Sequence, residues 1–590
     1  MTDFSGGIGS HSFWSQFFLV HQGISGLIVI FIYISIISLI AFAFSDYVVP
    51  LYKDEDTPLR PYTSYIIGFF EKLIGPLSLK RMKFKEYFLN LLFFNFVAAL
   101  AAFLFIYLLN SPGALSGRPL TVPEMVNTVV SFTTNTDMQH FPVAGHFPQF
   151  AIFFSILGLM VVAPVTGFAA SMAFIRGIRT NEENIGNFYH DFLVALFDLF
   201  IPLTVLFTIL FAIEGLPETL LSSVATNHFQ ASTARILPLG PVASFVSFSA
   251  VGTNGAAFYP SNSAFPLQNP SWFSNLTEIV AFTLVPLASI FSLGRVLGNK
   301  NFSRMLYGTV IFIYLFASVF TFYFELHGIP LYRNLGIHYT GNMIGKENAI
   351  GIAQSSVFNV GATISSAGLT NSALIGYTPG GIIGIMVGLM INDPLGGFGT
   401  SVINIFTFVI FTAFLASLMV GKLPELMGFK LGAKEIKYST LSLITHPLVV
   451  LVPLGLVAVA FGALSIQGNP SPQTITELFY EFTSAASNNG SSIGGLPFGR
   501  PFFEYLESII MILGRYLLLG FQLYIAQLFA NRRPRSESPN TVKVGSPYFG
   551  LLLLAVIMAI GLLSYFPVLA LGPFLSFARD LGLLLEVIPF

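Results

Sequence analysis

The sequence predicts an all-α polytopic membrane protein with about ten transmembrane helices. We expect four pseudo-repeats of helix, re-entrant loop and helix, plus one extra helix at each end. Composition is the first observation: 54% of the 590 residues are hydrophobic and only 9% are charged, whereas soluble domains carry about 25% charged residues. The second and third observations are ten long apolar runs and four similar polar clusters between them.

The ten apolar runs are long enough to span about 30 Å of hydrocarbon. In chain order they cover residues 24–48, 87–109, 149–175, 191–213, 276–298, 305–327, 379–420, 438–464, 502–530 and 548–572. The first run lacks a preceding basic segment and a small-residue cleavage site, which predicts a retained helix rather than a signal peptide. The run at 379–420 is much longer than one span, and NDPLGGFG (392–399) interrupts it. We interpret it as one crossing broken by a loop, because non-helical backbone at membrane depth requires surrounding protein or water.

Basic residues orient the predicted bundle. Twenty of the 27 Lys and Arg residues fall in the connections on one side, which the positive-inside rule makes cytoplasmic. Both termini and the long connections 110–148, 214–275, 328–378 and 465–501 are then extracytoplasmic. The net charge of −1 argues against nucleic acid as a partner, and the absence of cysteine excludes disulfides and thiolate chemistry.

Each of the four long connections carries a small polar cluster just before a spanning helix. The clusters read FTTNTDMQ (132–139), VGTNGAAF (251–258), ISSAGLTN (364–371) and ASNNGSSI (486–493). When the clusters are aligned, Asp137, Gly255, Gly368 and Gly490 occupy equivalent positions, at nearly constant spacing along the chain. This internal repetition predicts the following organisation: an N-terminal segment 1–23, a first helix 24–48, repeats at 85–180, 188–300, 303–422 and 437–531, a last helix 548–572 and a tail 573–590.

Four equivalent re-entrant loops around an axis can form a central cation filter. Backbone carbonyls can replace the hydration shell of a monovalent cation, and glycine permits the backbone conformations that this requires. Three clusters carry no charge, which points to K⁺ or Na⁺ held by dipoles. Close packing of membrane helices is the alternative explanation for any single small-residue cluster, but it does not explain four at constant spacing.

The chain resembles the potassium-binding A subunit (KdpA) of the Kdp-type potassium-transporting ATPase, which is related to the Trk and Ktr potassium transporters. The resemblance rests on motifs in the same order along residues 85–573. They are SFTTNTDMQ (131–139), LPLGPVASF (237–245), VGTNGAAFYPSNSAFPLQNPSWFSN (251–275), GNMIGKEN (341–348), LGGFG (395–399), VGKLPELMG (420–428), SAASNNGSSIGGL (484–496) and LALGP (569–573).

The resemblance implies a site and a complex. The implied K⁺ filter triplets are Asn135, Thr136 and Asp137; Thr253, Asn254 and Gly255; Ser366, Ala367 and Gly368; and Asn488, Asn489 and Gly490. Gln139 and Gly252 would support this filter. The implied partners are a P-type ATPase catalytic subunit, which hydrolyses ATP, and two accessory small subunits. K⁺ would be the transported ion, no ATP would bind in this chain, and the complex would reside in a prokaryotic plasma (inner) membrane.

The sequence departs from the family pattern near this filter. The first cluster reads NTDMQ where the family usually has NTNWQ, so Asp137 would place a carboxylate at the filter mouth. The second reads GTNGAAF rather than GTNGGGF. Before the double glycine at 396–397, Asn392 and Asp393 stand where the family usually has a Glu, and either could inherit its role.

Several other polar residues interrupt the apolar runs. Arg515 lies within a helix, where a mid-membrane Arg is costly; it would act beneath the filter or form a structural salt bridge. The break at Asn392 and Asp393, with the glycines Gly396, Gly397 and Gly399, would be a gating loop or a structural kink. His446 is expected to be a packed, hydrogen-bonded histidine rather than a proton relay.

Three functions remain to be weighed. They are a K⁺-translocating subunit of an ATP-driven import complex, a self-sufficient Trk-like K⁺ transporter or channel, and a membrane-embedded enzyme. The enzyme is disfavoured because no nucleophile, base and orienting group converge; His140 and His146 near Asp137 are the nearest candidates and lack metal-site spacing.

The chain carries no nucleotide-binding or phosphorylation motif, so any ATP is hydrolysed by a partner. A passive pore concentrates K⁺ only about 50-fold per 100 mV. The resemblance, rather than the physics, favours the pump subunit.

Overall fold

We describe the protein from a computed structural model. The structure describes residues 8–110, 119–141, 143–144, 151–180, 182–226, 235–329, 341–421, 423–461, 471–533 and 543–580. The end of the predicted tail, the basic residues Arg118 and Arg333, and His146 lie outside these residues.

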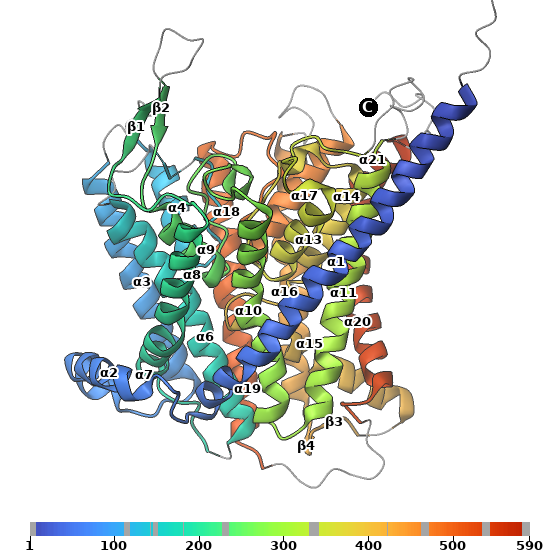
Figure 1. Cartoon of the computed structure of the whole chain (residues 1–590). Helices are drawn as coiled ribbons and strands as arrows, with labels where there is room; N and C mark the ends of the chain where they lie inside the picture. The colour runs from blue at the N-terminus through green and yellow to red at the C-terminus, as the bar shows by residue number, and fades with distance from the viewer. Residues whose placement is uncertain are drawn as a thin grey trace, which may run out of the picture.

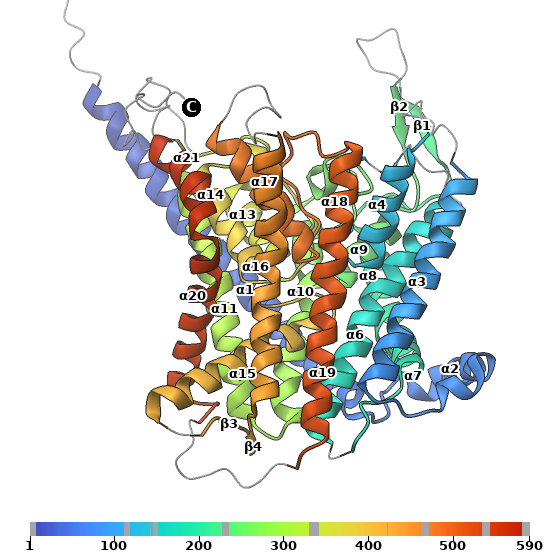
Figure 2. The same ribbon diagram turned by 180° about the vertical axis from the view of Figure 1, so that it is seen from behind.

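The described part of the chain is a bundle of roughly parallel and antiparallel helices (Figures 1 and 2). Ten helical stretches in it are long and apolar enough to cross a membrane, which confirms the predicted number. They are α1 (Ile8–Lys53), α3 (Phe84–Leu108), η2 with α6 (Ile152–Leu157 and Gly158–Arg179), α7 with η3 and α8 (Phe188–Val194, Ala195–Phe200 and Ile201–Ile213), α10 (Trp272–Val296), α11 (Lys300–His327), α15 (Thr400–Val420), α16 (Ala433–Phe461), α18 with η6 and α19 (Pro501–Ile512, Leu513–Leu517 and Leu518–Ala530) and α20 (Pro547–Leu571).

Four short helices lie within the bundle, in the upper half of both ribbon views (Figures 1 and 2). They are α4 (Val122–Thr133), α9 (Val242–Gly252), α13 (Gly351–Ile364) and α17 (Pro472–Ala486). With 11 to 15 residues each, they are too short to cross a bilayer at 1.5 Å per residue. Each ends at the first or second residue of one of the four polar clusters. We call them the pore helices.

The remaining elements connect these helices. They are α2 (Arg60–Ile74), η1 (Gly75–Ser78), η4 (Asn262–Ala264), η5 (Leu374–Gly376), α14 (Pro379–Met390) and α21 (Pro573–Asp580), with the antiparallel pairs β1 (Ser223–Thr226) with β2 (Arg235–Pro238) and β3 (Glu425–Leu426) with β4 (Phe429–Lys430).

The long apolar run at 379–420 is broken where the sequence predicts a break. Helix α14 ends at Met390 and α15 begins at Thr400. Asn392 and Asp393 both have positive φ, at 55° and 47°, a backbone conformation that cannot continue a right-handed helix. Because α14 has only 12 residues, the two helices form one interrupted crossing.

The first helix is longer than the sequence predicts. The segment 1–23 was expected to be separate from a helix starting at residue 24, but α1 is continuous from Ile8, and Figure 1 shows it slanting across the bundle. A run with several apolar residues and no Pro after position 8 has nothing that ends a helix. Farther along, Ile30, Ile37 and Ala41 are fully or almost fully buried, where α1 packs along α10.

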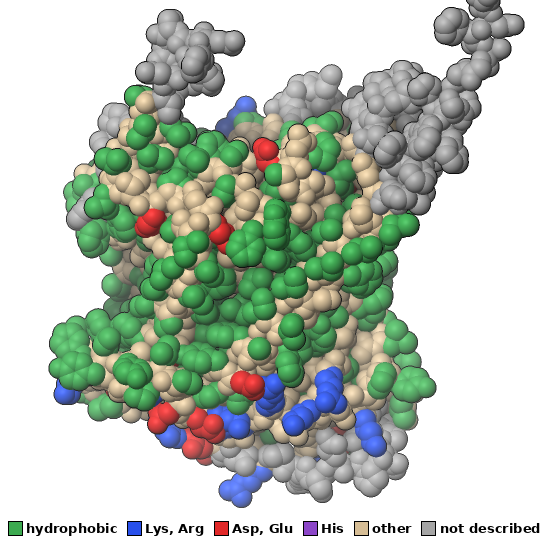
Figure 3. Space-filling view, in the orientation of Figure 1, with side chains coloured by type: hydrophobic (Ala, Val, Ile, Leu, Met, Phe, Trp, Pro, Cys, Tyr) green, Lys and Arg blue, Asp and Glu red, His purple; other side chains and the backbone are tan. Residues whose placement is uncertain are grey.

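The outer surface is apolar in a broad band, and Lys and Arg side chains gather at one end of the molecule (Figure 3). We call this the basic end; the pore helices lie nearer the opposite end. Helix α2 lies across the basic end (Figures 1 and 2). Tyr65, Phe69 and Leu73 of α2 are largely exposed, as expected for a helix that rests in a lipid interface.

Candidate functional site

The four polar clusters share one backbone conformation. In every triplet the first and third residues have positive φ and the middle residue does not. The eight residues are Asn135 and Asp137, Thr253 and Gly255, Ser366 and Gly368, and Asn488 and Gly490, with φ between 50° and 95°. Positive φ is uncommon for residues other than glycine, and five of these eight residues are not glycine. Their matching positions indicate one shared architecture. Alternating the sign of φ turns successive carbonyl groups toward the same side of the chain, as a carbonyl-lined ion path requires.

The backbone N–H groups of the triplets are held by the pore helices. In each cluster the middle residue donates its N–H to the carbonyl five residues earlier, near the end of the preceding pore helix. The four bonds are Thr136 to Ser131 (2.9 Å), Asn254 to Ser249 (3.1 Å), Ala367 to Ala362 (2.7 Å) and Asn489 to Ser484 (2.9 Å). These N–H donors are thereby satisfied within each loop, and the carbonyl oxygens of the same middle residues can face one another or an ion.

The loops approach so closely that glycine is required at two contacts. A Cβ added to Gly368 would lie 1.8 Å from the carbonyl oxygen of Asn489, and one added to Gly490 would lie 1.9 Å from that of Thr136. A Cβ on Gly255 would lie 2.8 Å from the Asn489 oxygen. These short distances show that the four loops, numbered 1 to 4 in chain order, meet at one place, as the repeated pattern predicts.

Side chains at the first triplet positions join neighbouring loops. Asn135 donates to the carbonyls of Gly252 and Thr253 at 3.1 and 3.0 Å, which ties loop 1 to loop 2. Ser366 donates to the carbonyls of Ser487 and Asn488 at 3.0 and 2.9 Å, which ties loop 3 to loop 4.

A third junction in this ring joins loop 4 to loop 1. Asn488 donates to the Thr136 hydroxyl at 2.9 Å. These side chains therefore fix the spacing of the loops, and the backbone faces the axis.

The site contains buried oxygen atoms without a hydrogen-bond partner among the described residues. They include Asn254 Oδ1 and both carboxylate oxygens of Asp137, although these side chains are almost completely buried. A buried polar atom without a partner is costly. In addition, the pore helices end at the triplets, so their negative dipole ends, each about half an elementary charge, point at the site. Oxygen ligands and negative potential together suit a cation.

The two supporting residues named from the sequence lie next to the triplets. Gln139 donates its side-chain amide to the carbonyls of Phe141 and Ala257, at 2.7 and 3.0 Å, which bridges loop 1 to the segment after loop 2. Gly252 is the last residue of α9, and its carbonyl accepts from Asn135.

The loop of the broken crossing lies directly against loops 2 and 3. Phe398 donates its N–H to the Thr253 hydroxyl at 2.7 Å, and Leu395 donates to the carbonyl of Ile364 at 3.1 Å. Gly396 and Gly399 have positive φ, and a Cβ on Gly399 would lie 2.3 Å from the backbone of Phe168.

A small cavity of about 30 Å³ separates this loop from the triplets. Asn392, Asp393 and Gly397 contribute to its lining, together with Asn135 and Ser366 of the triplets. The loop of the broken crossing therefore shares with the triplets a cavity that has room for about one water-sized occupant.

Arg515 lies in the wall of the same cavity, within the π-helical turn η6. Its Nη2 donates to the carbonyl of Ala163 at 3.0 Å, and no carboxylate lies within 4.0 Å of it among the described residues. The structural salt bridge considered from the sequence is therefore not found in the described part of the chain.

By contrast, His446 is buried and hydrogen-bonded to the carbonyl of Leu389 at 2.9 Å, as expected.

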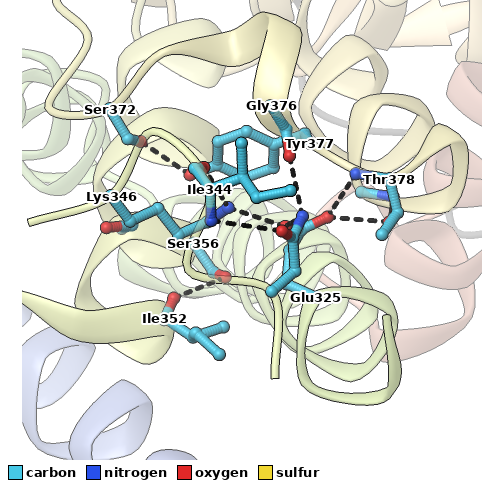
Figure 4. A network of polar contacts seen from close by, with 12 residues as sticks. Glu325, Ile344, Lys346, Ile352, Ser356, Ser372, Gly376, Tyr377 and Thr378 are labelled. Carbon is cyan, nitrogen blue, oxygen red and sulfur yellow. Dashed lines mark hydrogen bonds and ion pairs between the residues drawn. The ribbon is translucent and has the colours of Figure 1, made fainter. Parts of the chain in front are cut away.

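A buried ion pair supports loop 3, and the sequence did not predict it. Lys346 Nζ lies 2.7 Å from Glu325 Oε2, and both side chains are fully buried (Figure 4). The Lys346 ammonium also lies 3.7 Å from the centre of the Tyr377 ring. Burial lowers the pKa of Lys346, against the raising effect of the Glu325 charge. The other Glu325 oxygen accepts from the N–H and hydroxyl of Thr378, at 2.8 and 2.7 Å.

This pair reaches the third pore helix through Tyr377. The Tyr377 hydroxyl lies 2.8 Å from both Asn359 Nδ2, on α13, and Ser372 Oγ, just after the third triplet. In the sequence the only indication of this pair was Lys346 itself, in the segment GNMIGKEN (341–348). Its partner Glu325 lies near the end of the predicted transmembrane run 305–327.

These features define a polytopic membrane protein with a central site made of four pore loops. The sequence model described as "Potassium-transporting ATPase A subunit" (KdpA) matches residues 31–577. The chain belongs to this family.

Relatives cover nearly the whole chain. It is 50% identical over 575 residues to a protein of Thermoplasma acidophilum named potassium-transporting ATPase potassium-binding subunit, covering 97% of this chain and 98% of the relative. It is 49% identical over 577 residues to a protein of the same name from Thermoplasma volcanium, covering 98% of each. The potassium transporter TrkH from Vibrio parahaemolyticus, a solved structure, matches with a TM-score of 0.47 and 16% identity over 72% of this chain and 84% of that chain.

Proposed function

We propose that this chain is the potassium-binding and translocating subunit of an ATP-driven, high-affinity K⁺ import complex. K⁺ binds from the side opposite the basic end, between the carbonyls of the four triplets, and passes toward a P-type ATPase partner that hydrolyses ATP. Two accessory small subunits complete the complex. The chain itself performs no catalytic chemistry.

The observation that carries this proposal is the shared backbone of the four triplets. Positive φ at the first and third positions and the N–H bond to the pore helix recur in all four loops. Among the described residues the carbonyl oxygens of the four middle residues accept no hydrogen bond, so they can face the axis, and carbonyl oxygens without fixed charge suit a monovalent cation. The names of the relatives identify K⁺ as that cation.

The proposed orientation follows from the distribution of charge. The basic end faces the cytoplasm by the positive-inside rule, so both termini and the pore-helix N-termini face outward in a prokaryotic plasma (inner) membrane. The obstruction formed by residues 392–399 lies on the cytoplasmic side of the triplets. It would prevent free conduction, and an ion would then leave the cavity toward the partner subunit.

The test is the ATPase activity of the complex purified with this chain, titrated separately with K⁺ and Na⁺. Stimulation at low K⁺ is expected, and Gly255→Val should abolish it because Gly255 has a φ of 79° and contacts Asn489 and Gly368. Gly308→Val is the matched control, since nothing lies within 4 Å of a Cβ at Gly308. K⁺ uptake by the purified chain alone, with no associated ATPase, would instead establish a self-sufficient Trk-like transporter.

A further inference from the structure

A compact group of ionisable side chains lies beside loops 1 and 4. One ligand atom each from His140, Glu481 and Glu507 lie within 4.8 Å of one another. The Nε2 atom of His140 lies 2.8 Å from Glu507 Oε2. His140 directly follows Gln139 of loop 1, Glu481 belongs to pore helix α17, and Glu507 belongs to α18. Their distance in sequence explains why the sequence showed no metal-site spacing here.

The group holds more buried negative charge than the described residues neutralise. Glu481 and Glu507 are fully buried, and Glu504 nearby is 2% exposed. Among the described residues, His140 is the only cationic side chain within 4.0 Å of any of the three carboxylates. A buried charge without a counter-charge is strongly unfavourable, so a further cation or protons must be present.

The oxygen atoms in this group are also incompletely bonded. Glu507 Oε1 and Glu481 Oε1 have no hydrogen-bond partner among the described residues, despite their complete burial. The other Glu481 oxygen accepts from Ser492 at 2.6 Å, and Asn127 lies 3.5 Å from Glu507 Oε2. The side chains are therefore held in place while two of their oxygens remain available.

We propose that His140, Glu481 and Glu507 form a binding site for one divalent transition-metal cation. One imidazole nitrogen and two carboxylate oxygens are a donor set that suits Zn²⁺ and similar ions, whereas Ca²⁺ and Mg²⁺ prefer oxygen alone. The 2.8 Å separation of the His140 and Glu507 atoms is that of a hydrogen bond. An ion bound at about 2.0–2.2 Å would replace this bond, and the two atoms would move to roughly 3.3–3.6 Å apart. Small side-chain movements would bring the third ligand to the same distance.

The site would join two quarters of the pore-loop assembly. Ser492, which binds Glu481, follows the fourth triplet by two residues, and His140 follows the first triplet by three. A bound dication adds two positive charges beside the outer mouth and fixes loop 1 to α17. The consequence for transport, which rests on the proposed function, is inhibition of K⁺ entry into the filter by micromolar Zn²⁺.

The experiment is calorimetric titration of Zn²⁺ into the purified complex at neutral pH. One high-affinity ion per chain is expected. His140→Gln and Glu481→Gln should each weaken binding at least about 100-fold, because even outer-shell partners contribute 10- to 100-fold. His327→Gln removes a histidine at the same end of the molecule, outside the group, and should bind Zn²⁺ as the wild type does.

The outcomes are distinct. Absence of saturable Zn²⁺ binding, or equal binding by His140→Gln, would overturn the site and leave protons as the neutralising ions. Binding without inhibition of the K⁺-stimulated ATPase would retain the site and remove its role in transport. A complex without any K⁺-stimulated ATPase would refute the proposed function, while the Zn²⁺ titration would still decide the site. A melting-temperature measurement on each variant checks that it is folded.

Discussion

Replacing Lys346 by Met tests whether the buried ion pair supports the third pore loop. Methionine retains most of the apolar length of the side chain but removes the ammonium group that lies 2.7 Å from Glu325. Glu325 would keep its bonds from Thr378 and from Asn342 Nδ2, which lies at 2.7 Å. It would lose its only positively charged neighbour within 4.0 Å among the described residues.

The expected magnitude follows from the burial of both partners. Removing one member of a buried pair destabilises a protein by about 3–5 kcal/mol, because it leaves an uncompensated buried charge. The hydrogen bonds that remain on Glu325 place this variant toward the lower end of that range. Glu325→Gln combined with Lys346→Met removes both charges, and buried pairs replaced together are often close to neutral. The double variant should therefore be at least about 2 kcal/mol more stable than Lys346→Met alone.

The assay is the thermal midpoint of the purified complex for the wild type, both single variants and the double variant. Loss of loop support should also raise the K⁺ concentration for half-maximal ATPase stimulation in Lys346→Met, because the pair reaches Asn359 of α13 through Tyr377. If the double variant is as unstable as the sum of the two single variants, the pair has no coupling and this reasoning is refuted.

Three further predictions concern the site itself. Gly368→Ala should raise the K⁺ concentration for half-maximal ATPase stimulation at least tenfold, because its Cβ would lie 1.8 Å from a carbonyl oxygen and φ is 63°; equal behaviour of Gly368→Ala and the helical control Gly308→Ala would contradict it. Asp137→Asn keeps a side chain that tolerates positive φ and removes the carboxylate. The K⁺ concentration for half-maximal ATPase stimulation should therefore rise roughly tenfold, and an unchanged value would exclude an electrostatic role. Arg515→Gln removes a positive charge from the cavity wall, so K⁺ affinity measured by the same titration should rise about two- to tenfold; a fall in affinity with a lower thermal midpoint would instead assign Arg515 to structure.

Hydropathy predicted the membrane spans because span length is a local property of the chain. A run such as 87–109 is apolar throughout and has no charge inside it, so neighbouring elements hardly affect its conformation. The break after Met390 was predictable for the same reason, since Pro394 and three glycines follow within nine residues. Helix α1 begins before the predicted span 24–48, at Ile8, because nothing in residues 8–23 ends a helix, although hydropathy there is lower.

The candidate site was predictable only as far as it repeats. Four clusters at near-constant spacing marked the triplets, but their role as ion ligands stays a prediction. Contacts between distant segments left no signal in the sequence. Gln522 binds Asn404 at 2.9 Å across 118 residues, and His140 meets Glu507 across 367. Such pairs depend on how helices cross, which no local pattern records.

The four loops are equivalent in backbone but not in what surrounds them. Loops 2 and 3 contact the broken crossing, through Thr253 with Phe398 and through Ile364 with Leu395. Loop 4 instead contacts α18, where Asn488 donates to the Met511 carbonyl at 3.1 Å.

This difference divides the assembly into two sides. On one side a rearrangement of residues 392–399 would act directly on the hydroxyl of Thr253, the first residue of its triplet. On the other side the loops are bonded to a continuous helix with no such break. If the obstruction moves during transport, the second and third triplets should therefore change first, while the first and fourth hold the ion path in place.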